Sequence, residues 1–341
     1  MSRRKIIDCS SGISPLGPSR KVKAAIRKAA KKAGTYPEAE LARFRRLLTS
    51  KYGVPGDCIL VGGSREELIY LIASAVKPRK ALVAGLSPDV YEKASLAAGA
   101  EVKYIAGNEL SGFVVGPDEI RGQLEGVDLL FTANPNLITG VLTGRQGLSE
   151  LFQYASELGV VSVVDESLIE FTADDSYLSG LVSSDNIIVV RTTAFYYGLA
   201  GLELAYAVAS PSTIRRLAEA RVPQAGTLAV EAAIAAIKDK TYKRLVKEFV
   251  LEEKSLLMRS FRGLEGITCR DSDSNIVQVK MLYPEETLRA LAAGGFSFRS
   301  FAGAAALPPD FLGLSVMGHD KNQRFIRMLK RRLRSGTAPA A

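Results

Sequence analysis

Histidine, tryptophan and closely spaced cysteines are what this 341-residue sequence lacks. It has one histidine, His319, no tryptophan, and three cysteines, Cys9, Cys58 and Cys269, that lie far apart. Zinc centres and disulfide frameworks need paired or closely spaced ligands, so the sequence predicts neither. A single histidine also argues against histidine-based metal sites and histidine-dependent catalytic triads. The cysteines are expected to be buried bystanders.

Long apolar runs are missing as well. No stretch reaches the length of a membrane span, and residues 1–5 are followed by no signal-like apolar segment. We therefore expect a soluble cytoplasmic protein with no membrane partner. The formal net charge is +9, but the densest positive clusters, 20–32 and 330–334, have the pattern of solvated faces of amphipathic helices. No aromatic residues interleave them and no nucleic-acid-binding motif accompanies them, so nucleic acid is not an expected partner.

Short apolar strands alternate with amphipathic helices between residues 58 and 210. Continuous Val/Ile/Leu strands separated by helices predict an α/β fold with a mostly parallel seven-stranded sheet covered on both faces. The predicted strands are 58–62, 81–85, 101–105, 127–132, 160–165, 186–192 and 204–209. Predicted helices between them are 66–75, 90–98 and 148–158.

The C-terminal part has a different pattern. Helices are predicted at 225–238, 242–262 and 320–334, with strands at 275–279, 296–298 and 311–316. A few strands with helices on one side predict a small α+β domain. The domain prediction is an N-terminal segment 1–40, a large domain 41–235, a small domain 236–334 and a frayed tail 335–341.

Ligands of open α/β sheets bind at the carboxyl ends of the strands, which directs attention to Asp165 at the end of an apolar strand. A carboxylate in that position needs a partner. A helix N-cap is an equally open role for Asp165 at this point.

Seven short motifs, in order, resemble those of the aminotransferase class I/II family of fold-type I pyridoxal-phosphate (PLP) enzymes. Threonine-phosphate decarboxylase and histidinol-phosphate aminotransferase are the most similar branches. The motifs are DCSSGISPLG at 8–17, YPE at 36–38, CILVGGSREELI at 58–69, NPNLITG at 134–140, VDESLIEF at 164–171, RTTAFYYGLAGLELAY at 191–206 and FLGLSV at 311–316. The resemblance implies the PLP-transferase fold and a dimer in which residues 1–40 pack on the small domain and on the partner.

The lysine that such enzymes use to form a Schiff base with PLP aligns with Phe195. No lysine occurs between Lys103 and Lys238, so no neighbour in that interval replaces it. The resemblance therefore implies that no covalent PLP adduct forms at this site.

Other cofactor ligands of the family are replaced together. The two residues that bond the pyridine hydroxyl align with Leu137 and Leu168, and the aromatic that stacks on the ring aligns with Pro88. The serine beside the lysine aligns with Ala194, and the phosphate-binding arginine aligns with Glu203, which reverses the charge.

The helix start that holds the cofactor phosphate, here called the phosphate cup (residues 63–67), has changed too. Its Ser-Thr pair aligns with Arg65 and Glu66. In the substrate pocket, the arginine that clamps a carboxylate aligns with Gly313, and the N-terminal asparagine aligns with Ser14.

Some family positions are retained. Asp165 stands where the partner of the pyridinium nitrogen belongs, Asn136 keeps its place in the NPN motif, and Tyr36 stands where a tyrosine reaches the neighbouring subunit's phosphate. Arg299 and Asn275 fall at family-like positions of the small domain. Each of Asp165, Tyr36 and Arg299 also has an ordinary alternative as a helix cap, a packing residue or a surface residue.

Three functions follow as hypotheses. The first is a noncatalytic structural or regulatory partner, as a homodimer or in a heterodimer with a related chain. The second is a repurposed pocket that binds a small metabolite or catalyses a PLP-independent reaction, and the third is a working transaminase or decarboxylase. PLP itself is expected to bind at most weakly and noncovalently.

The first hypothesis predicts a pocket filled by the chain itself. Glu203 is expected to pair with Arg65 or to accept helix N–H bonds, so that the protein supplies its own anion. Phe195, Leu137 and Leu168 are expected to take the place of the pyridine ring. The alternative is that both charges point to solvent.

Overall fold

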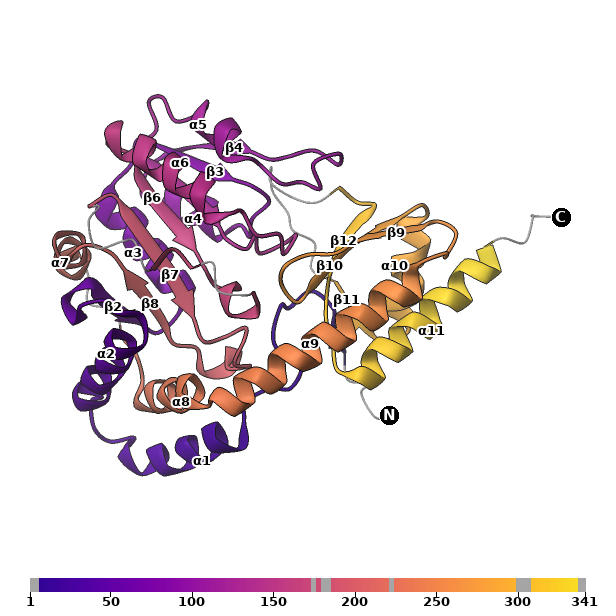
Figure 1. Cartoon of the computed structure of the whole chain (residues 1–341), viewed down its shortest axis with the longest axis horizontal. Coiled ribbons are helices and arrows are strands. Elements are labelled where there is room, and N and C mark those ends of the chain that lie inside the picture. The colour runs from indigo at the N-terminus through magenta and orange to yellow at the C-terminus, as the bar shows by residue number, and fades with distance from the viewer. Residues whose placement is uncertain (1–5, 173–175, 179–184, 221–223, 299–307, 337–341) are drawn as a thin grey trace.

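A seven-stranded sheet forms the centre of the large domain (Figure 1). The computed structural model describes residues 6–172, 176–178, 185–220, 224–298 and 308–336. The strand order is β2-β8-β7-β6-β5-β3-β4. The strands are β2 Ile59–Gly62, β3 Lys80–Ala84, β4 Glu101–Ile105, β5 Leu129–Ala133, β6 Val161–Asp165, β7 Ile187–Thr192 and β8 Ala205–Val208.

Only β8 runs against its neighbours, pairing antiparallel with both β7 and β2, while the other pairs are parallel. The expectation of a mostly parallel sheet of seven strands is therefore confirmed. Successive residues of a strand point to opposite faces. Accordingly Val189 joins one apolar cluster, and Ile188 and Val190 join the other, so both faces of the sheet are buried.

Helices cover the two faces as separate layers. One layer contains α3 (Arg65–Val76), α4 (Val90–Ala97) and α7 (Pro211–Ala220), whose apolar residues belong to one core cluster. The other contains α2 (Glu38–Tyr52), α5 (Pro117–Arg121), α6 (Arg145–Glu157) and α8 (Thr227–Lys238). Helix α1 (Arg20–Ala29), followed by the 3-10 turn η1 (Ala30–Lys32), lies outside and packs on α8 (Figure 1).

The small domain is built around the antiparallel sheet β12-β10-β9. Its strands are β9 Ile267–Arg270, β10 Ile276–Met281 and β12 Phe311–Ser315, and its helices are α10 Pro284–Ala293 and α11 His319–Gly336. The N-terminal strand β1 (Ile7–Asp8) pairs in parallel with β11 (Phe296–Ser297), which ties the chain's start to this domain. Helix α9 (Lys240–Phe261) runs from beside α8 to the small domain (Figure 1).

The structure adds elements that the sequence pattern did not predict. Strand β9 lies at the edge of its sheet and alternates half-buried with exposed residues, so it has no continuous apolar run. The tail is predicted to begin at residue 335, and α11 ends at Gly336. Glycine is a common residue at helix ends because it tolerates the backbone turn there. Within the described residues, no helix is both long enough and apolar enough to span a membrane.

Candidate functional site

Asp165 ends the central strand β6 and is completely buried. Its Oδ2 accepts hydrogen bonds from Arg65 Nη1 at 2.8 Å and from the Tyr91 hydroxyl at 2.7 Å. Its Oδ1 accepts the Ser167 N–H at 3.0 Å and the Ser167 hydroxyl. Both oxygens are thus satisfied by the chain itself. Asp165 caps no described helix, because the next turn, η3 (Ile169–Phe171), has Leu168 at its N-cap.

Arg65 is the first residue of α3, and its side chain turns inward to this carboxylate. The guanidinium is buried, and although burial opposes its charge, the Asp165 carboxylate raises the pKa of Arg65 above its ordinary value. Tyr91, from α4, stacks on Phe131 with parallel rings 5.1 Å apart between centroids. Burial raises the pKa of Tyr91 well above its ordinary value, so the phenol remains a donor to Asp165. The ion pair is therefore held from two helices.

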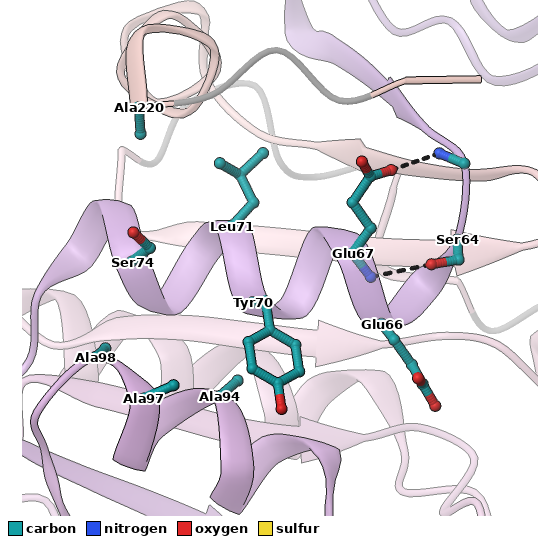
Figure 2. Close-up of a pocket in the computed structure, with 11 residues that line it drawn as sticks. Ser64, Glu66, Glu67, Tyr70, Leu71, Ser74, Ala94, Ala97, Ala98 and Ala220 are labelled. Atoms are coloured by element: carbon teal, nitrogen blue, oxygen red, sulfur yellow. Dashed lines mark hydrogen bonds between the residues drawn. The ribbon is translucent and has the colours of Figure 1, made fainter.

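Three backbone amides of the phosphate cup, those of Gly63, Arg65 and Glu67, donate to side chains of the protein. Glu203 Oε1 accepts the N–H of Arg65 at 3.0 Å and the Thr192 hydroxyl at 2.6 Å. The N-cap hydroxyl of Ser64 accepts the N–H of Glu67 at 3.0 Å, and the Glu67 carboxylate turns back to the N–H of Gly63 at 2.7 Å (Figure 2). Two carboxylates therefore stand at the positive end of α3, which favours negative charge.

Glu203 is expected either to pair with Arg65 or to accept helix N–H bonds. The structure shows the second arrangement. The side chain of Arg65 pairs with Asp165 instead of Glu203. The free-energy cost of an unpaired carboxylate grows with its burial. Asp165 is completely buried and Glu203 is half-buried, so pairing Arg65 with Asp165 stabilises the protein more. Glu66 does not join either group. It is exposed and lines an open groove of about 820 Å³ along α3 and α4, beside Tyr70 (Figure 2).

Phe195 and Leu168 meet at the N-terminal segment. A Cβ placed on Gly12 would lie 3.4 Å from the Phe195 ring and 4.0 Å from Leu168. The Phe195 carbonyl also accepts the N–H of Ser14 at 2.8 Å. Leu137 is partly buried and packs against both core clusters. Phe195 and Leu168 thus both lie beside Gly12, and all three residues belong to or pack against the same core cluster.

The position that the resemblance aligns with a carboxylate-clamping arginine has no room for a side chain. Gly313 lies on β12 opposite Gln278, and a Cβ there would stand 2.6 Å from the Ile138 carbonyl oxygen. Asn136 shapes this loop, because its Oδ1 accepts the N–H groups of Ile138 and Thr139 and its amide donates to the Leu86 carbonyl. The NPNLITG loop therefore lies directly against the small domain.

The remaining predicted residues are spread over several elements. Asn275 is buried and its Nδ2 donates to the Gly12 carbonyl at 2.8 Å, next to the Phe195 contact. Ala194 is buried, and Pro88 is half-buried in the turn before α4. Tyr36 projects into solvent with 87% of its surface exposed. Arg299 lies outside the described residues.

A second buried charge cluster uses motif residues to which the sequence analysis gave no role. Arg191, at the end of β7, donates through Nε and Nη2 to Glu166 Oε2 at 2.9 and 2.8 Å. Glu170 pairs with Lys51 at 3.2 Å and with Lys243. Glu166, Glu170 and Arg191 all stand in the VDESLIEF and RTTAFYYGLAGLELAY motifs, so the motifs themselves were the available signal. Tyr91 had none, since its helix matched no quoted motif.

PLP, the cofactor that the resemblance implies, does not fit the residues present. Its Schiff base needs a lysine, and none occurs between Lys103 and Lys238. Its pyridinium nitrogen needs Asp165, which Arg65 already neutralises at 2.8 Å. Its phosphate needs the amides at the start of α3, where the Glu203 carboxylate is bound. Each of the three groups that would hold the cofactor is therefore missing or engaged.

The chain is similar to known proteins over nearly its whole length. A family model described as aminotransferase class I and II matches residues 4–326. "Histidinol-phosphate aminotransferase 2" of Archaeoglobus fulgidus is 30% identical over 96% of this chain and 93% of its own. "Threonine-phosphate decarboxylase" of Salmonella typhimurium is 25% identical over 100% of this chain and 94% of its own.

A solved structure supports the fold. Histidinol-phosphate aminotransferase from Sinorhizobium meliloti in complex with pyridoxal-5'-phosphate superposes with a TM-score of 0.85 at 21% identity, covering 98% of this chain and 92% of that one. The family match over residues 4–326 agrees with the seven motifs and with the central sheet. The chain therefore belongs to the aminotransferase class I and II family.

Proposed function

We propose that this protein is a noncatalytic member of its family that acts as a structural or regulatory partner. The observation that carries the proposal is the buried Arg65–Asp165 ion pair, with Nη1 and Oδ2 2.8 Å apart. In a PLP enzyme of this family, the aspartate is needed for the cofactor's ring nitrogen. Here a cation of the chain itself neutralises it, so the aspartate keeps a partner without any cofactor.

The charge at the phosphate cup supports the same proposal. A dianionic phosphate entering the cup would meet the Glu203 carboxylate, which already accepts the Arg65 N–H at 3.0 Å. Like charges at such separations repel strongly in a partly buried site. The Thr192 hydroxyl donates to the same oxygen of Glu203, so the carboxylate has two donors to lose if it is displaced.

A working aminotransferase or decarboxylase is the competing function, because the similar relatives carry those names. The discriminating assay supplies PLP and measures amino transfer from histidinol phosphate to a 2-oxo acid, and carbon dioxide release from threonine phosphate. We expect no product above a PLP control without protein. The Phe195→Lys variant should also stay inactive, because Arg65 and Glu203 remain in place. PLP-dependent turnover by the natural chain would contradict the proposal, and an active relative assayed in parallel is the control.

A partner chain is the second part of the proposal. Tyr36 is an aromatic side chain with 87% of its surface exposed, in the turn just before α2. In relatives the corresponding tyrosine reaches the neighbouring subunit, which supports a homodimer or a heterodimer with a related chain.

We expect light scattering at micromolar concentration to give twice the 36.6 kDa chain mass. The Tyr36→Asp variant should shift the equilibrium toward a single subunit, because it places a charge where the proposed dimer would bury an aromatic ring. The Tyr70→Asp variant, at a 41% exposed tyrosine on α3, is the matched control. A natural chain that scatters as one subunit would contradict the homodimer.

A further inference from the structure

Lys51, near the end of α2, lies in a charged cluster separate from Asp165 and the phosphate cup. Its ammonium donates to the Tyr52 hydroxyl oxygen at 2.6 Å and to Glu170 Oε1 at 3.2 Å. Its side chain keeps 28% of its surface exposed, so it borders solvent. The cluster joins α2 to the turn after β6, to β7 and to α9.

Three cations share the carboxylate of Glu170. Glu170 is contacted by Lys51, by Lys243 from α9, and by Arg191 Nη1 at 3.8 Å. Despite its burial, Lys243 and the other two cations hold the pKa of Glu170 well below its usual range. Glu170 is therefore an anion at any neutral pH, and it is the only carboxylate that Lys51 contacts among the described residues.

Among the described residues, the other charged or titratable groups of the cluster leave no second counter-charge for Lys51. Glu166 is bound to Arg191, and the other groups are tyrosines or the cations Arg191 and Lys243. The groups that face Lys51 or its partners are Tyr52, Glu166, Glu170, Arg191, Tyr196, Tyr197, Tyr206 and Lys243.

The proton on Lys51 is consequently easy to remove. Burial and the like charge of Lys243 together lower the pKa of Lys51 to about 8, against the attraction of Glu170. At pH 7.5 a group with that pKa is neutral in about a quarter of molecules, compared with about 0.1% for an ordinary lysine. Burial raises the pKa of Tyr52 well above its ordinary value, so this neighbour stays a neutral phenol that donates to Glu170 at 3.0 Å.

We propose that Lys51 is a nucleophilic amine that small aldehydes modify. The neutral nitrogen attacks the carbonyl carbon and forms a C–N bond. The carbonyl oxygen then leaves as water, taking both hydrogens of the amine, and an imine remains. No oxidant or reductant is needed, since amine plus aldehyde equals imine plus water. The site is independent of the noncatalytic role, because it uses neither Asp165 nor the phosphate cup.

Reductive methylation with limiting formaldehyde and cyanoborohydride, read by peptide mass spectrometry, tests this on the intact chain. At pH 7.5 we expect Lys51 to be methylated at least about tenfold faster than Lys23, an exposed lysine of α1. The ratio should fall as the pH rises above 8, because the neutral fraction of Lys51 then has little left to gain. Equal or slower methylation of Lys51 at pH 7.5 would overturn the proposal.

The Lys243→Met variant tests the cause. Removing this cation takes away a repulsion and frees Glu170 for Lys51, so both effects raise the pKa of Lys51. We expect methylation of Lys51 at pH 7.5 to slow severalfold while Lys23 is unchanged. An unchanged or faster rate at Lys51 would contradict the inference that Lys243 lowers the pKa of Lys51. If this variant does not fold, the pH profile of the natural chain alone decides.

Discussion

Replacing Arg191 with methionine is expected to lower the free energy of unfolding by about 3–5 kcal/mol. The guanidinium is buried and makes two hydrogen bonds to Glu166, whose side chain is fully inaccessible. Despite burial, the Glu166 carboxylate raises the pKa of Arg191 well above its ordinary value. Methionine would fill similar space but leave a buried carboxylate without a counter-charge. Urea denaturation followed by circular dichroism measures the change.

Arg43→Met is the matched control for that measurement. Arg43 also makes a two-bond pair, with Glu231 at 3.0 and 3.2 Å, but its side chain is 44% exposed. Exposed pairs contribute at most about 1 kcal/mol, because water solvates either charge when the other is removed. A loss at Arg191 no larger than the loss at Arg43 would contradict a structural role for the buried pair.

The Arg191 pair shows that the family-like motifs also carry residues of the buried core. In VDESLIEF and RTTAFYYGLAGLELAY, the resemblance assigns Leu168, Ala194, Phe195 and Glu203 to the cofactor site. Glu166 and Arg191 stand in the same motifs and form a buried ion pair, 2.8 Å apart. We propose that the cofactor positions can change while this pair is kept.

Much of the fold could be predicted from the sequence, because the strands of the large sheet are short apolar runs bounded by helices. The strand Glu101–Ile105 has both of its predicted ends, and the strand Val161–Asp165 has its predicted C-terminal end. The edge strand Ile267–Arg270 could not be predicted, since only alternate residues are partly buried. The hydrophobic periodicity of a sequence indicates which residues are buried, and an edge strand of a small sheet buries few of them.

The partners within the site could not be predicted in the same way. Arg65 and Asp165 are 100 residues apart, and the choice of Asp165 over Glu203 depends on which carboxylate is more deeply buried. Tyr91 completes the pair from α4, a helix whose sequence matches no motif. These contacts depend on the exact positions of α3 and α4 on the sheet. The sequence pattern predicts that the two helices pack on the sheet, and it does not predict which side chains meet.

The double substitution Arg65→Ser with Glu203→Arg is expected to increase affinity for PLP on the order of 100-fold. It removes the cation on Asp165, removes the carboxylate on the helix amides and supplies an arginine to the phosphate. Arg65→Ser with Glu66→Arg makes the same change in net charge, but residue 66 is exposed on the groove side of α3, so no such increase is expected. Equal affinities of the two variants would show that Glu203 does not block the cup.

Equilibrium dialysis of the natural chain against PLP tests the central claim most directly. The Lys51→Arg variant is dialysed in parallel, so that an imine at Lys51 is not counted as binding in the pocket. The filled pocket predicts no saturable one-to-one binding below about 1 mM, which corresponds to a binding free energy weaker than about −4 kcal/mol. One-to-one binding at micromolar PLP that persists in Lys51→Arg would contradict it, because Arg65 and Glu203 would then be yielding their positions to the cofactor.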